Sequence, residues 1–285
     1  MDDDTARAPS GEPAPAAPAC PRRQDVPVVI LCGGEGTRFH EESQYRPKPL
    51  AEVGGWPILC HIMQLYARHG FRRFVLCLGY KGGMVKDFFL HYQTRHRDFA
   101  LRLGAPPGED APRFLDAAPG QDWEVSFVDT GPAAMTGARL KRVERHLPGE
   151  HFLLTYGDGL ADLDLGALLA FHLAHGATGT VTGVRPLSQF GEMRCEGDRV
   201  LSFAEKPRVP SVINGGFFAF RRDFLGYLGE DDGCVLEREP LVRLAADGGL
   251  RVYRHDGFWQ CMDTVRDLTL LRDLWDGGRA PWKAW

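Results

Sequence analysis

The segment that decides the fold is residues 28–55, VVILCGGEGTRFHEESQYRPKPLAEVGG. Its first four residues are all apolar, as expected for a parallel strand that is buried on both faces. The glycine-rich residues 33–38 follow, and glycine lets backbone N–H groups approach an anion that a Cβ would obstruct. Arg38 adds a fixed positive charge, and Arg46-Pro47-Lys48-Pro49 places two more cations on a backbone stiffened by proline. The segment therefore predicts a buried strand that leads into a polyphosphate-binding loop.

A glycine-rich turn after a strand also occurs without any ligand, so residues 33–38 alone leave a plain tight turn equally open. The turn is not a Walker A loop, because no Gly-Lys-Ser/Thr follows it. It also lacks the G-x-G-x-x-G pattern of dinucleotide-binding proteins, which counts against a dehydrogenase. The cations that follow, and then Gly54-Gly55-Trp56-Pro57, favour the phosphate site.

Length and composition narrow the class of protein. The chain has 285 residues, enough for one large α/β domain with a sizeable core. A net charge of −4 argues against a general nucleic-acid binder and against a membrane-surface protein held by basic residues. The 7 cysteines are scattered without a C-x-x-C pair, which is typical of reduced thiols in a cytoplasmic protein. No apolar run reaches the length of a membrane span, and no apolar signal segment is present.

The first residues of the chain differ in composition from the rest. Residues 1–25 are rich in proline, alanine and charge and poor in large apolar side chains. Such a segment cannot bury enough apolar surface to offset the entropy of ordering it. We expect a disordered tail at residues 1–25 and one folded domain at residues 26–285.

A strand, glycine turn and helix recur after the opening segment. Residues 57–70 have a proline in the first turn, an apolar face and a final glycine, and they predict a helix. Residues 74–78 predict the next strand, which ends in a second glycine turn that contains Gly79 and Tyr80. In open α/β sheets, ligands bind at the carboxyl edge where such turns meet. The repetition predicts a doubly wound fold, whereas residues 95–121 break the pattern and predict a β-excursion or a mobile loop.

Two further strand ends carry candidate ligand-binding side chains. A strand at residues 124–128 is followed by a helix near residues 135–140, where Thr136 could be only a cap or could, with Arg139, meet an anion or a base edge. The apolar strand at residues 152–156 delivers Asp158 between two glycines. A carboxylate at that place suits Mg²⁺, which proteins hold with one or two carboxylates plus phosphate oxygens and water. An Asx-turn at a strand end is the alternative for Asp158.

The last third of the chain offers four more candidate features. Glu205 and Lys206 follow a strand and precede a proline, so they are either an exposed pair or a clamp for sugar hydroxyls and phosphate. The glycine step after Asn214 indicates a close approach to the backbone. Asp263 could cap the helix that follows it or could supply a second carboxylate to the metal. Trp259 could be core packing or a wall for the sugar.

Taken together, these motifs resemble the bacterial glucose-1-phosphate cytidylyltransferases, members of the sugar-1-phosphate nucleotidyltransferase superfamily. They occur in that family's order and extend over most of the chain: VVILCGGEGTR, RPKPLAEVGGWPILCHIM, LGYKG, VDTG, MTGARLKRV, TYGDGLADLD, FAEKP, INGGFF, GFWQCMDT and APWKAW. The resemblance implies a Rossmann-like, doubly wound, mostly parallel mixed sheet with helices on both faces and a small β/helical sugar-binding extension. It also implies a Mg²⁺-dependent, cytoplasmic homo-oligomer that transfers CMP from CTP to glucose-1-phosphate.

The resemblance further implies roles for matching residues. Catalysis would fall to Arg38, Lys48, Asp158, Lys206 and Asp263, and the metal to Asp158 and Asp263. Nucleotide binding would fall to Leu31, Gly33, Gly34, Glu35, Gly36, Thr37, Arg38, Lys48, Gly79, Tyr80, Thr136, Arg139, Gly157 and Asp158. The sugar phosphate would meet Glu205, Lys206, Asn214, Gly215 and Trp259.

Phosphate chemistry supports the same reaction without a general base. A sugar-1-phosphate is mostly dianionic at neutral pH, because the second pKa of a phosphate monoester is about 6. Its oxygen can attack the α-phosphorus directly, so the protein has to position the reactants and stabilise charge. No Ser-His-Asp or Cys-His arrangement is recognisable in the sequence, which fits this chemistry.

Some residues depart from the family's usual pattern and leave alternatives open. Cys32 stands in place of an alanine, Phe39-His40 replaces a Leu-Ser-like pair, and residues 190–194 differ on the expected sugar side. One alternative is the same chemistry with GTP, dTTP or UTP and a heptose-type or octose-type sugar-1-phosphate. Another is a catalytically silent, nucleotide-sugar-binding regulatory subunit, although Lys48, Asp158 and Asp263 are all present.

Overall fold

The computed structural model describes residues 21–36, 45–104, 106, 110–116, 122–186, 191–205, 211–283 and 285. Its centre is a seven-stranded sheet in the order β14-β10-β13-β8-β1-β4-β7. The strands are Leu250–His255 (β14), Gly179–Val184 (β10), Ile213–Arg221 (β13), His151–Tyr156 (β8), Pro27–Leu31 (β1), Arg73–Leu78 (β4) and Glu124–Asp129 (β7). All pairs are parallel except those of β13, which is antiparallel to both β8 and β10.

Strand β1 lies inside this sheet, and all five of its residues are buried. Val28 and Ile30 belong to one hydrophobic core, and Val29 and Leu31 belong to the other. Strand β13 alternates in the same way between the two cores. A strand with apolar side chains on both faces of a sheet has to be covered by other elements on each face. The continuous apolar run in the sequence therefore requires three layers, with the sheet in the middle.

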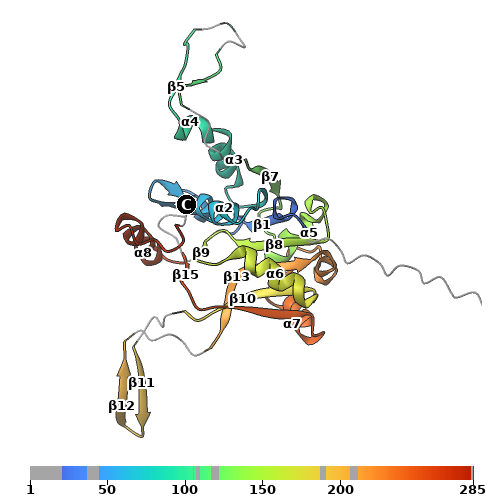
Figure 1. Cartoon of the computed structure of the whole chain (residues 1–285), viewed down its shortest axis with the longest axis vertical. Coiled ribbons are helices and arrows are strands. Elements are labelled where there is room, and N and C mark those ends of the chain that lie inside the picture. The colour runs from blue at the N-terminus through green and yellow to red at the C-terminus, as the bar shows by residue number, and fades with distance from the viewer. Residues whose placement is uncertain are drawn as a thin grey trace, which may run out of the picture.

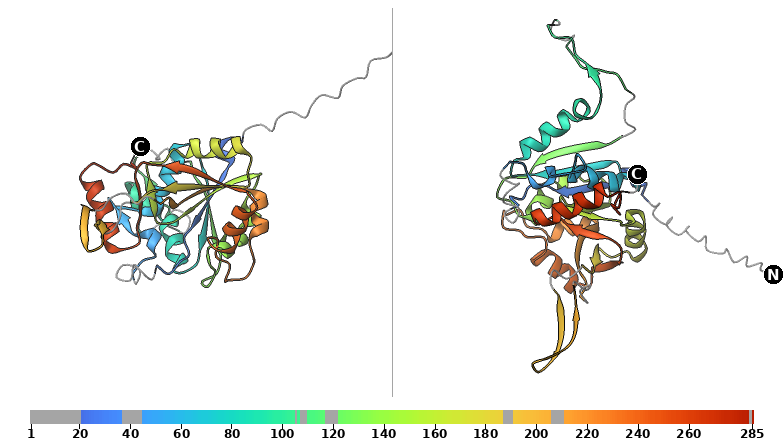
Figure 2. Two further views of the ribbon diagram at one scale, coloured as in Figure 1. Left: turned by 90° about the horizontal axis from the view of Figure 1, so that it is seen from below. Right: turned by 90° about the vertical axis from the view of Figure 1, so that its left-hand side faces the viewer.

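Helices provide this cover on both faces, as Figures 1 and 2 show. The core on one face includes residues of α2 (Ile58–Arg68), α3 (Gly82–Leu90), α6 (Leu165–His175) and α8 (Val265–Asp276). The core on the other face includes residues of the 3₁₀ helix η5 (Arg222–Tyr227) and α7 (Glu239–Ala246), as well as Leu140 of α5 (Thr136–Arg142). The doubly wound α/β fold predicted from the sequence is therefore confirmed.

The order of the strands places the site. From β1 the chain proceeds to β4 and β7 on one side, and it returns to β8 on the other side of β1. The carboxyl ends of β1 and β8 therefore flank the topological switch point, where open α/β sheets bind ligands. The first glycine turn follows β1, and Asp158 follows β8.

Two extensions project from opposite ends of the molecule in Figure 1. At one end, α3 leads to α4 (Tyr92–His96) and the short antiparallel pair Phe99–Ala100 (β5) and Arg113–Phe114 (β6). The described part of residues 95–121 thus contains the β-excursion that the sequence suggested. At the other end, Glu192–Glu196 (β11) and Arg199–Ala204 (β12) form a hairpin with every residue exposed.

Short elements outside the seven-stranded sheet carry residues of the site. Lys48–Leu50 (η3) leads into the pair Glu52–Val53 (β2) and Trp56–Pro57 (β3), and Gly159–Ala161 (β9) pairs with Trp259–Cys261 (β15). The indole of Trp275 on α8 lies where a Cβ on Gly54 would be, and Gly54 has a φ of +58°. Both the close approach and the left-handed backbone require glycine there. The two remaining 3₁₀ helices are Arg23–Asp25 (η1) and Glu144–His146 (η4).

The described cysteines are all free thiols, as expected, and Cys32, Cys60 and Cys77 are buried. Among the described residues, none of the helices has the length and apolar character that crossing a membrane requires. The expected tail lies almost wholly outside the described residues, so the domain boundary at residue 26 stays a prediction.

Three histidines lie between α6 and the sheet: His172, which is buried, and His175 belong to α6, and His151 belongs to β8. His151 Nδ1 lies 3.3 Å from His172 Nε2, and both His172 and His175 hydrogen-bond to Thr180 Oγ1, at 2.9 and 2.7 Å. Burial, and then the neighbouring His151 and His175, lower the pKa of His172 to about 3. The folded protein therefore strongly favours neutral His172.

We predict that this histidine makes folding sensitive to acid. Its folded pKa lies below the unfolded value of about 6.5, so its stabilising contribution is present above that value and is lost as the pH falls towards 3. The free energy of unfolding should fall by up to about 1.4 kcal/mol per pH unit from this group alone. Urea unfolding between pH 7.5 and 4.5 should show a shallower pH dependence for His172→Asn than for the wild type. The exposed His91→Asn is the control, and parallel curves for wild type and His172→Asn would contradict the prediction.

Candidate active site

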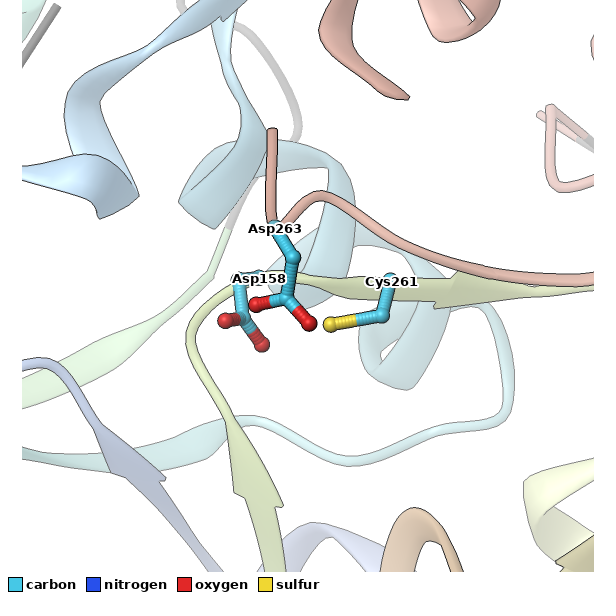
Figure 3. A group of neighbouring side chains, drawn as sticks. All are labelled: Asp158, Cys261 and Asp263. Atoms are coloured by element: carbon cyan, nitrogen blue, oxygen red, sulfur yellow. The ribbon is translucent and has the colours of Figure 1, made fainter. Parts of the chain in front are cut away.

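Three residues from distant parts of the chain meet at the carboxyl edge of the sheet. Lys48 Nζ donates hydrogen bonds to Asp158 Oδ2 at 2.6 Å and to Asp263 Oδ1 at 2.8 Å. The Lys48 side chain is 12% exposed, that of Asp158 is 21% exposed and that of Asp263 is 43% exposed, so the ion pair with Asp158 is the better shielded from water. Figure 3 shows the two carboxylates side by side, with the thiol of Cys261 next to them. The structure thus brings together the lysine and the two aspartates that the sequence singled out.

Backbone contacts fix Asp158. The preceding Gly157 donates its N–H to Leu31 O at 3.1 Å, and Met262 N donates to Asp158 O at 2.9 Å. A Cβ on Gly157 would lie 2.9 Å from Leu31 O, so only glycine allows β8 to continue this close to the end of β1. The end of the central strand and the segment before Asp263 therefore hold the turn on both sides.

Asp263 is not the N-terminal cap of α8. Thr264 is the N-cap residue, and it forms a reciprocal capping box with Asp267. Asp267 also accepts a hydrogen bond from the backbone N–H of Asp263 at 3.1 Å. The sequence Thr264-x-x-Asp267 is a recognisable capping signal, and it could have decided between the two roles considered for Asp263. The carboxylate of Asp263 turns to Lys48 instead.

Opposite charges control the protonation of the cluster. Burial alone would lower the pKa of Lys48, but the charge of Asp158 and hydrogen bonds to both aspartates outweigh it and raise the pKa above its usual value. Lys48 therefore stays an ammonium at neutral pH. One ammonium between two carboxylates leaves a net negative charge, which favours the arrival of a further cation.

The carboxylate pair fits a hard divalent cation. Ligand atoms of Asp158, Cys261 and Asp263 all lie within 4.8 Å of one another. Carboxylate oxygens are the donors that Mg²⁺ takes, together with phosphate oxygens and water. Burial, followed by the charges of Asp158 and Asp263, raises the pKa of the Cys261 thiol. Sulfur is also not a donor that Mg²⁺ prefers. Sequence reasoning missed Cys261, and its only signal was the distance of two residues from Asp263.

Arg139 occupies a different position from the one expected. It was expected to face the base and ribose, but the residue is 4% exposed and its guanidinium lies beneath the glycine turns. It donates hydrogen bonds to Gly33 O (2.9 Å), Leu78 O (3.1 Å), Thr130 Oγ1 (2.8 Å), Gly131 O (2.8 Å) and Pro132 O (3.3 Å). In this structure the guanidinium therefore binds backbone from three strand ends.

This buried guanidinium explains two of the glycines. A Cβ on Gly33 would lie 2.2 Å from Arg139 Nη1, and one on Gly79 would lie 2.4 Å from it. Tyr80 N also donates to Gly33 O at 3.1 Å, so the two glycine turns contact each other directly. Gly34 and Glu35 are exposed and Gly36 has a φ of +63°, while Thr37 and Arg38 lie outside the described residues.

On the expected sugar side, the structure joins Asn214, Gly215 and Trp259. The indole N–H of Trp259 donates to Gly215 O at 2.7 Å, which holds β15 against β13. Asn214 Oδ1 accepts a hydrogen bond from Gly216 N at 2.8 Å. Glu205 follows β12 on the projecting hairpin, and Lys206 lies outside the described residues.

Thr136 does not cap α5. The N-cap is Met135, and the hydroxyl of Thr136 donates to Glu237 Oε2 at 2.7 Å. Glu237 also accepts a hydrogen bond from the hydroxyl of Tyr156. Sequence reasoning missed Glu237, because it lies in an irregular segment before α7 and no local pattern connects it to residues about a hundred positions earlier.

A separate cavity of about 310 Å³ lies between α2, α4, α8 and the C-terminal residues. Its lining is largely aromatic and includes Trp56, Tyr92, Trp123, Trp275 and Trp285. None of the lining residues belongs to the carboxylate–lysine cluster. The chemistry of the switch point is therefore distinct from this cavity.

Comparisons with known proteins agree with this geometry. The family model described as nucleotidyl transferase matches residues 27–260. The chain is 44% identical to the glucose-1-phosphate cytidylyltransferase of Salmonella typhi over 260 residues, which are 90% of this chain and 99% of that protein. It is 42% identical to the probable glucose-1-phosphate cytidylyltransferase of Bacillus subtilis over 258 residues, again 90% of this chain and 99% of the relative.

Solved structures support the fold. HddC from Yersinia pseudotuberculosis superposes with a TM-score of 0.64 at 20% identity, over 88% of this chain and 99% of that one. At these identities the likeness concerns the fold alone. With the family match over most of the sequence and with the high identity to the curated relatives, the chain belongs to the nucleotidyl transferase family, in its glucose-1-phosphate cytidylyltransferase branch.

Proposed function

We propose that this nucleotidyltransferase transfers CMP from CTP to glucose-1-phosphate and releases pyrophosphate. The observation that carries the proposal is the placement of Lys48 between Asp158 and Asp263 at the switch point of the sheet. The turn that carries Asp158 is hydrogen-bonded to the end of β1, and the nucleoside triphosphate would bind at the glycines that follow β1. The names of the curated relatives supply the choice of CTP and glucose-1-phosphate.

In the proposed reaction, an oxygen of the sugar phosphate forms a bond to the α-phosphorus of CTP. The bond between that phosphorus and the bridging oxygen breaks, and pyrophosphate leaves with the electron pair. Lys48, held as an ammonium, neutralises charge on the phosphates as they approach and separate. We assign the same role to Arg38, which the resemblance places in the nucleotide loop. The glycine turns supply backbone N–H groups, and their conformation is fixed by Arg139.

Asp158 and Asp263 would hold the metal, and Mg²⁺ matches their oxygen donors. When bound, Mg²⁺ would neutralise the triphosphate and orient it towards the attacking oxygen. The binding of CTP and of Mg²⁺ should therefore depend on each other, because each supplies part of the other's coordination or charge compensation.

We further propose that the sugar phosphate meets Asn214, Gly215 and Trp259 on β13 and β15, and Glu205 and Lys206 at the end of the hairpin. Residues 26–285 would form the nucleotidyltransferase domain. The enzyme would act as a homo-oligomer in the cytoplasm, and the free thiols of the described cysteines support a reducing compartment.

The substrates can be tested directly. The protein is incubated with CTP, UTP, dTTP, GTP or ATP and with a panel of hexose, heptose and octose 1-phosphates, and the nucleotide sugar is identified by its mass. CDP-glucose should be the main product. A preferred product with another base or a longer sugar would replace this assignment, and no product from any combination would indicate a silent relative.

Asp158→Asn should lower turnover by at least about a hundredfold, because the amide keeps the shape of the side chain but loses the charge that compensates the metal. Pyrophosphate release with Mg²⁺ present measures the effect. Asp164→Asn is the matched control, since Asp164 caps α6 and asparagine caps a helix equally well. Near-normal turnover in folded Asp158→Asn would remove Asp158 from the mechanism.

Melting temperatures measured with and without Mg²⁺ should show whether Asp263 binds the metal. In the wild type, CTP with Mg²⁺ should raise the melting temperature more than the sum of the shifts from CTP and from Mg²⁺ alone. Asp263→Asn should lose this additional shift and keep the shift from CTP in EDTA. If Asp263→Asn retained the full Mg²⁺-dependent increment, Asp263 would not be a metal ligand.

A further inference from the structure

A hydrogen-bonded chain of four side chains connects the nucleotide side of the site with its sugar side. Asn214 Nδ2 donates to Tyr156 Oη at 3.2 Å, and the Tyr156 hydroxyl donates to Glu237 Oε1. The other carboxylate oxygen of Glu237, Oε2, accepts from Thr136 Oγ1 at 2.7 Å. We call Thr136, Glu237, Tyr156 and Asn214 the relay. It spans from the start of α5 to the second residue of β13.

The direction of each hydrogen bond in the relay is fixed by chemistry. An ionised carboxylate only accepts hydrogen bonds, so both hydroxyls must donate to Glu237. The oxygen of Tyr156 is then left to accept, and Asn214 has to present its NH₂ group to it. Thr136 Oγ1 likewise accepts from Leu236 N at 2.9 Å.

These bonds determine which way the Asn214 amide faces. Its carbonyl oxygen accepts from Gly216 N and its NH₂ group donates to Tyr156, so the opposite orientation would pair two donors at one end. The glycine at position 216 has a φ of +80°, and a Cβ there would lie 2.5 Å from the Tyr156 ring. Packing therefore holds the ring, and hydrogen bonds hold the amide.

The amide retains capacity for a ligand. An amide NH₂ group has two donors and its oxygen has two lone pairs, and the described residues use one of each. Asn214 is exposed, and the next residue, Gly215, is fixed by Trp259. Tyr156 lies two residues before Asp158, so the exposed Asn214 amide, with one N–H and one lone pair left over, lies at the same end of β8 as the carboxylate cluster.

We propose that Glu237 is a positioning residue for the acceptor sugar, which it controls through Tyr156 and Asn214. Glu237 fixes the direction of the relay, and Asn214 thereby offers one donor and one acceptor to adjacent hydroxyl groups of the sugar. This assignment rests on the proposed function. The ligand class is a hexose ring with neighbouring hydroxyls, and the relay selects among epimers by the placement of that donor and acceptor.

Glu237→Gln tests the direction of the relay with almost no change in shape. Glutamine would place an NH₂ group against either Thr136 or Tyr156, and a donor facing Tyr156 reverses that hydroxyl and opposes the NH₂ group of Asn214. The KM for glucose-1-phosphate should rise about 3- to 10-fold, the value of one hydrogen bond, and its preference over galactose-1-phosphate should fall by a similar factor. Glu239→Gln is the matched control, because Glu239 pairs with Arg243 on α7 and lies outside the relay.

A double-mutant cycle separates positioning from general damage to the fold. Tyr156→Phe removes the same connection, so the double variant Glu237→Gln/Tyr156→Phe should show no higher KM for glucose-1-phosphate than the worse single variant. An unchanged KM in Glu237→Gln, or effects of the two substitutions that multiply, would overturn the proposal.

A measurement without turnover distinguishes this proposal from the proposed function. The side-chain NH₂ signals of Asn214, assigned by their loss in Asn214→Ser, should shift when glucose-1-phosphate is added to the wild type and to Glu239→Gln, but much less in Glu237→Gln. If these shifts occur while no nucleotide sugar is formed, the proposed reaction fails and the relay stands. If the Asn214 signals of the wild type do not respond to glucose-1-phosphate, the relay proposal fails.

Discussion

The site depends on one ammonium group, that of Lys48, which compensates the negative charges of Asp158 and Asp263. Asp158 and Asp263 carry like charges and lie close together, and they are stable there only because a cation lies between them. In this structure Lys48 supplies that cation. The cluster thus links η3, the turn after β8 and the segment before α8 through one ammonium group. Any rearrangement that removes Lys48 would leave two partly buried carboxylates to repel each other, so the cluster both builds the site and restricts the chain around it.

The fold supplies the scaffold for this cluster. Strand β1 is buried on both faces and pairs in parallel with β8. The turns that follow these two strands therefore lie next to each other at the carboxyl edge. Strand β13 runs antiparallel to both of its neighbours in the seven-stranded sheet, and it brings a glycine step to the same edge from the opposite direction. The parallel strand β8 leads to Asp158, whereas the antiparallel strand β13 supplies the amide of Asn214. The two kinds of strand therefore provide two kinds of chemistry at one edge.

The sequence predicted those features that depend on local pattern. The apolar run at residues 28–31, the glycines after it and Asp158 between two glycines all lie at strand ends, where residue type and position are closely connected. The structure also placed Lys48 and Asp263 with Asp158, although more than two hundred residues separate the first two. Arg139 differed because exposure cannot be read from a lone arginine in a helix. Glu237 and Cys261 were missed because only tertiary packing brings them to the site.

The guanidinium of Arg139 has a consequence for local motion. It donates hydrogen bonds from α5 to the carbonyl groups of Gly33, Leu78 and Gly131, so one side chain holds the ends of β1, β4 and β7. Partial unfolding of α5 would release all three ends together, because one side chain holds all of them. The ends of these three strands and α5 therefore behave as one cooperative unit. Any local motion that lets a ligand enter or leave has to occur in segments outside this unit.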